Sequence, residues 1–157
     1  MSLPRVLVIG YGNPARGDDG LGPALADRLE RLALPGVTVD ADYQLAIEHA
    51  ALAAEHDIVV FADAAAGGEA AFSFAPIGPA GDASFSTHAV TPGQVLALAG
   101  SCFGAAPAGY VLAIRGHALE GFTEGLTDAA RAGLEAALGH LVAFIGTSQS
   151  ETDDARR

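Results

Sequence analysis

The sequence predicts an α/β protein, a three-layer α/β/α domain with a twisted, mainly parallel sheet of about five strands and helices on both faces. Short apolar runs at residues 6–9 and 58–62 are typical of buried parallel strands. Between such runs lie segments whose apolar residues recur at helical spacing, as at residues 21–34. Alternating strands and helices favour a parallel sheet that helices cover on both sides.

Each element of the first half has its own signal. The first strand ends at Gly10, and Pro35-Gly36 stops the helix over residues 21–34. A second strand is predicted from Val37 toward Tyr43. An alanine-rich helix follows over residues 46–55, because alanine is the strongest helix former. The strand over residues 58–62 is predicted to end at Asp63.

The second half continues the alternation. Residues 71–77 lie between two glycine-rich segments, and their apolar and polar side chains alternate, which predicts an edge or antiparallel strand. Thr91-Pro92 predicts the start of a helix that runs to about Cys102, since a capping hydroxyl precedes proline at the first helical position. A strand over residues 110–114 and a helix capped by Thr127, ending near Ile145, complete the fold. We expect one domain over residues 1–147 and a disordered polar tail over residues 148–157.

Charge and composition exclude several classes of protein. The 157 residues carry 8 basic and 19 acidic side chains, a net charge of −11, and none of the bases is lysine. This balance argues against nucleic acid or an anionic membrane as partner. A single cysteine, Cys102, excludes a disulfide scaffold or a cysteine-rich metal site, and we expect it to be a small core residue. Neither a leader nor a membrane span is apparent, so the cytoplasm is the expected compartment.

Candidate site residues follow the predicted strands, where ligands bind in open α/β sheets. Asp18 and Asp19 follow the first strand, Asp63 follows the strand over residues 58–62, and His88 precedes the helix that begins after Thr91. Two carboxylates and one imidazole suit a divalent metal such as nickel, zinc or iron, and three ligands leave positions open for substrate.

Plainer roles are open for the same residues. Asp19 as a helix N-cap, Asp18 as a solvated loop acid and His88 as an ordinary loop histidine are the alternatives. Asn13 either donates to a developing oxyanion or serves a tight turn, and Arg16 either pairs with Asp18 or is solvated. The other histidines are expected on helix faces or solvated loops: His49, His56, His117 and His140.

A nucleotide site is the competing interpretation of the first loop. Gly10-x-Gly12-x-x-Ala15 matches a dinucleotide fingerprint, and Asp40 near the end of the second strand is placed to bind a ribose. Against this, Pro14 has no N–H to offer a phosphate, and residues 16–20 delay the helix. The acid pair would also repel a pyrophosphate. No serine or cysteine nucleophile with an activating pattern is visible.

Four segments together resemble a known family. Residues 8–22 read V-I-G-Y-G-N-P-A-R-G-D-D-G-L-G, and residues 61–68 place an Asp at a strand end before Gly67-Gly68. Ser86-Thr87-His88 precedes Thr91-Pro92, and residues 114–116 and 124–127 precede the last helix. In this order they resemble the nickel–iron hydrogenase maturation proteases over residues 5–145.

The resemblance implies a cytoplasmic, monomeric endopeptidase that removes a C-terminal extension from the precursor of a hydrogenase large subunit after nickel insertion. It carries the catalytic and nickel-recognising roles to Asp19, Asp63 and His88, with Gly12, Asn13, Arg16 and Asp18 as supporting loop residues. Asp19 is one methylene shorter than the glutamate often found in the family. The nickel would come with the substrate, so no resident metal or other cofactor is expected. Whether the metal is catalytic or a recognition tag is open, and a non-catalytic metal-binding assembly factor is the alternative function.

Overall fold

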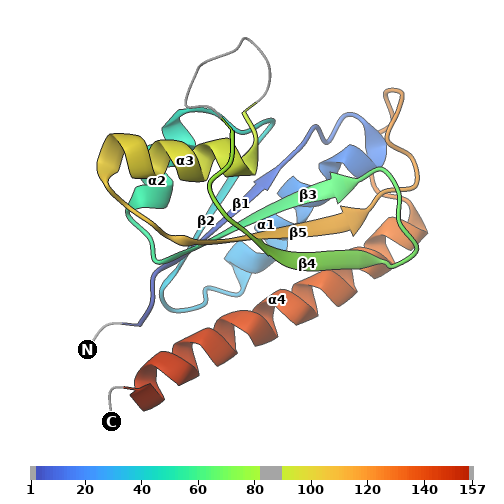
Figure 1. Ribbon diagram of the computed structural model, residues 1–157. Coiled ribbons are helices and arrows are strands. Elements are labelled where there is room, and N and C mark those ends of the chain that lie inside the picture. The colour runs from blue at the N-terminus through green and yellow to red at the C-terminus, as the bar shows by residue number, and fades with distance from the viewer. Residues whose placement is uncertain (1–2, 82–89, 156–157) are drawn as a thin grey trace.

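The sheet has five strands in the order β2-β1-β3-β5-β4, and the computed structural model describes residues 3–81 and 90–155 (Figure 1). The strands are β1 (Val6–Tyr11), β2 (Val37–Asp42), β3 (Ile58–Ala65), β4 (Phe72–Ile77) and β5 (Ala108–Arg115). β2, β1, β3 and β5 are mutually parallel, whereas β4 pairs antiparallel with β5 at one edge. The predicted fold class is confirmed.

Helices cover both faces of this sheet. Helices α1 (Leu21–Arg31) and α4 (Asp128–Ala155) pack on one face, and α2 (Glu48–Ala54) and α3 (Pro92–Phe103) pack on the other (Figure 1). A short 3-10 helix, η1 (Gly17–Gly20), lies between β1 and α1. Successive residues of β1 alternate between the two cores: Val6 and Val8 face α1 and α4, whereas Leu7 and Ile9 face α2 and α3. Burial on both faces explains why the strand is continuously apolar.

Both predicted helix caps are confirmed. The Oγ1 of Thr91 accepts a hydrogen bond from the N–H of Gln94 at 3.2 Å, and the N–H of Thr91 donates to Oε1 of Gln94 at 2.8 Å. This reciprocal pair is a capping box. At α4, the Oγ1 of Thr127 accepts from the N–H of Ala130 at 3.2 Å. These caps fix where α3 and α4 begin at the edge of the sheet that carries the candidate residues.

Three local features differ from expectation. Strand β3 continues through Asp63 to Ala65, since its last residues still pair with β5. Cys102 is exposed rather than in the core, because it lies in the last turn of α3. Helix α4 continues past Ile145 to Ala155, where a polar tail was expected.

Polar contacts help to extend α4 beyond its apolar residues. Leu141 and Ile145 are buried, and further along the Oγ of Ser148 donates to the carbonyl of Phe144 at 2.9 Å. The side chain of Gln149 donates to the carbonyl of Pro35 at 2.7 Å. Polar contacts of this kind do not produce a hydrophobic periodicity, so the sequence pattern did not predict this part of the helix. Within residues 3–81 and 90–155, none of the helices has both the length and the apolar character needed to cross a bilayer.

Candidate functional site

The first loop and strand β3 bring two candidate carboxylates to the carboxyl edge of the sheet. Asp19 lies in η1, just beyond the end of β1, and Asp63 lies near the end of the neighbouring strand β3. The two acids are close enough that the charge of Asp19 raises the pKa of Asp63. Each is partly exposed. The third predicted residue, His88, lies outside the described residues.

Asp18 has a different environment from Asp19. Its side chain is fully buried. One oxygen, Oδ2, accepts from the N–H of His117 at 2.7 Å, the N–H of Ala118 at 3.0 Å and the Oγ1 of Thr127 at 2.8 Å. The other, Oδ1, accepts from the N–H of Thr127 at 2.8 Å. Burial alone would raise the pKa of Asp18, but these bonds outweigh it, and the net effect holds the pKa below its ordinary value.

These contacts separate the roles of the two adjacent acids. A carboxylate has about four lone-pair positions, and Asp18 receives four hydrogen bonds, so little capacity remains for a metal. The expectation of a solvated loop acid at Asp18 is therefore wrong. Arg16 is exposed, and the donors to Asp18 come from residues 117–127 instead. Asp18 ties the first loop to the segment between β5 and α4.

Asp19 keeps most of its acceptor capacity. Among the described residues, its Oδ2 accepts one hydrogen bond, from the N–H of Asn13 at 2.8 Å. It does not cap α1, whose N-cap is Gly20 without a side-chain bond. The side chain of Asn13 accepts from the N–H of Ala15 at 3.0 Å, which is the turn role open to it from the sequence. The first loop is thus folded on itself, with one carboxylate presented at its surface.

Asp63 combines partial burial with few hydrogen bonds from the part of the chain that the structure describes. Its Oδ1 accepts from the N–H of Ala64 at 2.7 Å. Burial raises its pKa to about 6, with the charge of Asp19 adding to the effect, while the bond from Ala64 and an interaction with the hydroxyl of Tyr11 oppose it. Asp63 is therefore mostly ionised at pH 7 although partly desolvated. Such a carboxylate gains most from a cation.

Tyr11 is the residue of this site that the sequence did not indicate. Burial and the negative charge of Asp63 raise the pKa of its phenol, so the hydroxyl stays protonated and acts as a donor toward Asp63. The strand register brings the two together, since Gly10 of β1 lies beside Ala62 of β3, and Tyr11 and Asp63 are the next residues. The only signal was position: Tyr11 ends the strand next to the one that carries Asp63.

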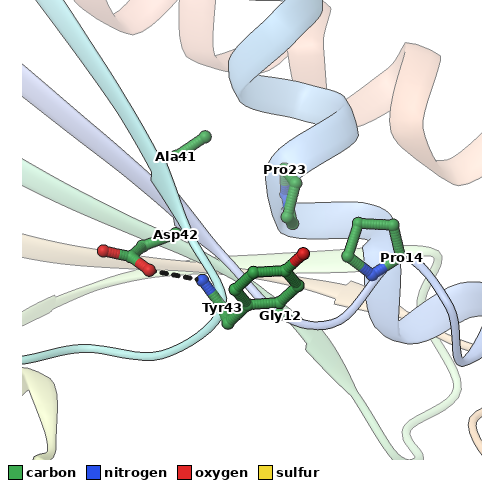
Figure 2. Close-up of a pocket in the computed structure, with 6 residues that line it drawn as sticks. All are labelled: Gly12, Pro14, Pro23, Ala41, Asp42 and Tyr43. Carbon is green, nitrogen blue, oxygen red and sulfur yellow. Dashed lines mark hydrogen bonds between the residues drawn. The ribbon is translucent and has the colours of Figure 1, made fainter.

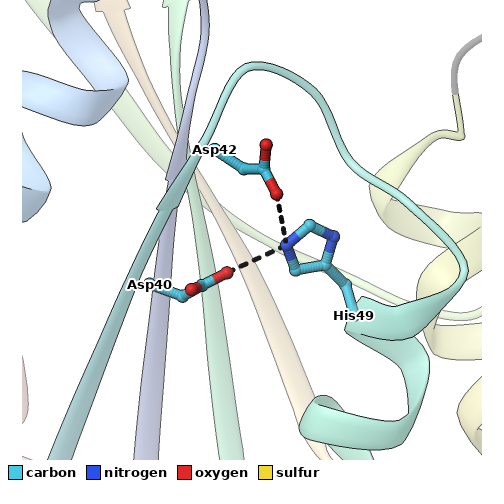
Figure 3. Close-up of side chains that lie close together, drawn as sticks. All are labelled: Asp40, Asp42 and His49. Atoms are coloured by element: carbon cyan, nitrogen blue, oxygen red, sulfur yellow. Dashed lines mark hydrogen bonds and ion pairs between the residues drawn. The ribbon is translucent and has the colours of Figure 1, made fainter.

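A second cluster lies at the end of β2 (Figure 3). The Nε2 of His49 lies 2.9 Å from Oδ2 of Asp40 and 3.9 Å from Oδ2 of Asp42. His49 lies in helix α2, one of the two expected locations, but its side chain is buried, at 4% exposed, rather than solvated. Its Nδ1 accepts from the N–H of Ala46 at 2.8 Å. With Nδ1 as acceptor, the neutral ring carries its proton on Nε2, which donates to Asp40.

This tautomer argues against a metal at the second cluster, although Asp40, Asp42 and His49 are close enough together to surround one. A metal on Nε2 would displace that proton while Nδ1 is still held by Ala46. The cluster instead holds the start of α2 against β2. It also occupies Asp40, the residue that the nucleotide interpretation needed for a ribose.

The structure thus places two partly exposed acids, Asp19 and Asp63, at the carboxyl edge of a mainly parallel α/β sheet. Several solved structures with this fold are hydrogenase maturation proteases. The NiFe hydrogenase maturation protease HycI of Thermococcus kodakarensis is similar with a TM-score of 0.69 and 25% identity, over 91% of this chain and 92% of that one.

Two further structures agree in fold. The hydrogenase 2 maturation peptidase of a Thaumarchaeota archaeon has a TM-score of 0.68 and 23% identity, over 90% of this chain and 98% of its own. The hydrogenase maturating endopeptidase HybD of Escherichia coli has a TM-score of 0.68 and 21% identity, over 92% and 93% of the two chains. No protein-family model and no curated protein matches the sequence. The resemblance inferred from the sequence is thus confirmed by the structural neighbours.

Proposed function

We propose that this chain is an endopeptidase of hydrogenase maturation that removes the C-terminal extension from the precursor of a nickel–iron hydrogenase large subunit after nickel insertion. A hydrolase of the peptidase class is supported by the neighbours, which are maturation proteases or endopeptidases by name. The observation that carries the finer proposal is the pair Asp19 and Asp63, two adjacent carboxylates with acceptor capacity to spare.

In this proposal the nickel is part of the substrate. Asp19 and Asp63 repel each other, so a cation that arrives between them relieves the repulsion and the cost of partial burial together. His88 is the proposed third ligand. A metal held in this way positions the scissile bond, polarises its carbonyl or activates water. The alternative is a carboxylate acting as general base on water, with the nickel as a recognition tag.

The proposed partner is the nickel-loaded precursor, met in the cytoplasm by a monomeric enzyme. Asp63→Asn tests the site, because it keeps the size of the side chain and removes its charge. We expect cleavage of the nickel-loaded precursor to slow by about 100-fold or more, as measured by mass spectrometry of the released peptide. Asp19→Asn and His88→Ala should behave alike, and precursor without nickel should not be cut.

Asp57→Asn is the matched control. Asp57 directly precedes β3, at the opposite end of the strand from Asp63, and its carboxylate accepts from the N–H of Arg5 at 2.7 Å. It should leave the cleavage rate within about twofold. Wild-type rates in Asp63→Asn would contradict the proposed site. Tight binding of the precursor by the wild-type protein with no peptide released would instead favour the non-catalytic assembly factor.

A further inference from the structure

Two exposed aromatic side chains flank the first loop at the carboxyl edge. Phe122, between β5 and α4, is 90% exposed, and Tyr43, just after β2, is 71% exposed. Thr123, next to Phe122, accepts a hydrogen bond from the N–H of Gly17 at 2.7 Å, so Phe122 lies beside the first loop. Burying large aromatic surface is the main source of affinity in protein interfaces. Among the described residues, neither ring stacks on another aromatic side chain.

Two neighbouring pockets lie along the first loop, and Tyr43 lines one of them. One, of about 200 Å³, is lined by Gly12, Pro14, Pro23, Ala41, Asp42 and Tyr43 (Figure 2). The other, of about 320 Å³, lies toward Gly125 and Leu126. Pro14 and Pro23 line both pockets, which makes the surface continuous. Figure 2 shows the carboxylate of Asp42 directed away from the proline rings, whereas the hydroxyl of Tyr43 points toward them.

This surface is continuous with the proposed active site. Asn13 lies between Gly12 and Pro14 of the first pocket, and its N–H holds the carboxylate of Asp19 at 2.8 Å. On the other side, the buried Asp18 anchors the segment that carries Phe122. The backbone of one loop therefore fixes the position of a partner bound at the pockets relative to the proposed metal-binding acids.

We propose that the two pockets, with Tyr43 and Phe122, form the docking surface for the folded precursor protein; this rests on the proposed function. The exposed acids Glu120 and Glu124 lie on either side of Phe122 in the sequence, and the chain has no lysine. The complementary surface is accordingly an apolar patch bordered by arginine or lysine. Docking a folded protein, rather than a short peptide, accounts for two anchors placed on opposite sides of the loop.

The experiment compares Phe122→Ser and Tyr43→Ser with the control Phe103→Ser. Phe103 is also an exposed phenylalanine, at 55%. It is the last residue of α3 and so lies at the end of that helix that is farther from the site. We expect KM for the nickel-loaded precursor to rise about 10-fold in each test variant, with kcat and melting temperature unchanged. Glu120→Gln/Glu124→Gln should lower the association rate and its salt dependence. Phe103→Ser should match the wild type.

Binding of the precursor, measured separately by calorimetry, distinguishes this inference from the proposed function. Wild-type protein that binds but does not cleave would overturn the function alone, and loss of binding in Phe122→Ser would still support the docking surface. Unchanged KM and affinity in both test variants would overturn the docking surface. So would an equal loss in Phe103→Ser, no binding of the precursor by the wild type, or a wild-type dimer that Phe122→Ser converts to monomer.

Discussion

Two neighbouring aspartates of the first loop differ because different donors surround them. Asp18 is buried among three backbone N–H groups and one hydroxyl, whereas Asp19 receives one N–H, from Asn13, within residues 3–81 and 90–155. A carboxylate whose lone pairs are filled is a structural anchor, and one with free lone pairs is available to a ligand. At the scale of single residues, the same side chain thus serves stability at one position and function at the next.

Substitution of each aspartate by asparagine should separate the two roles. Asp18→Asn places an amide NH₂ against groups that are themselves donors, so we expect the free energy of unfolding to fall by about 3 kcal/mol. Asp19→Asn should change it by less than about 0.5 kcal/mol and abolish precursor cleavage. Urea denaturation of both variants measures the difference. Equal stability of the two would contradict the assignment.

At the scale of elements, close packing explains the glycines at the end of β1. A Cβ on Gly10 would lie 2.1 Å from the carbonyl oxygen of Gly22 in α1. A Cβ on Gly22 would lie 2.3 Å from the oxygen of Tyr11 and 2.6 Å from that of Ala62. Helix α1 therefore lies directly against the strands that carry the site. In the fingerprint-like G-x-G, Gly10 serves this contact, whereas a Cβ on Gly12 would lie 2.0 Å from the carbonyl oxygen of Asp19 in η1.

Gly22→Ala tests the contact between α1 and the strands. The added methyl must push α1 away from β1 and β3, and we expect a loss of about 1–3 kcal/mol in the free energy of unfolding. Gly139→Ala is the control, since nothing lies within 4 Å of its added Cβ in α4. It should gain about 0.5–1 kcal/mol from helix propensity. Thermal unfolding of both variants provides the comparison, and stabilisation by Gly22→Ala would refute close packing.

For the whole molecule, the features that could be predicted from the sequence are those that depend on a local sequence pattern. The buried strands, the caps at Thr91 and Thr127 and the placement of Asp19 and Asp63 at one edge all follow from periodicity and topology. The sequence did not specify contacts between distant segments. Asp18 meets Thr127 across 109 positions, and Gln149 meets Pro35 across 114. No local signal marks such partners, so the sequence left Asp18 open between a site residue and a solvated acid and predicted a shorter α4.

The proposed site should also make the stability of the whole fold depend on pH. Burial raises the pKa of Asp63 from its ordinary 3.8 to about 6, so the folded protein holds this proton more tightly than the unfolded chain does. Asp63 therefore lowers stability progressively as the pH rises from about 4 to about 6, and the loss persists above that. Asp18 acts in the opposite direction, since its lowered pKa contributes stability that is lost only in acid.

Asp63→Asn should remove this penalty, because asparagine is neutral at every pH. We expect the melting temperature of the variant to match the wild type at pH 4 and to exceed it at pH 7, with the gap opening between these values. Cleavage by the wild type should fall as the pH drops below about 6, where Asp63 takes up its proton. A gap that is independent of pH would show that folding does not change the pKa of Asp63. A variant that is less stable than the wild type at pH 7 but not at pH 4 would show that contacts in the fold favour the charge of Asp63. Greater stability together with lost cleavage would show that the uncompensated carboxylate is retained for its cation.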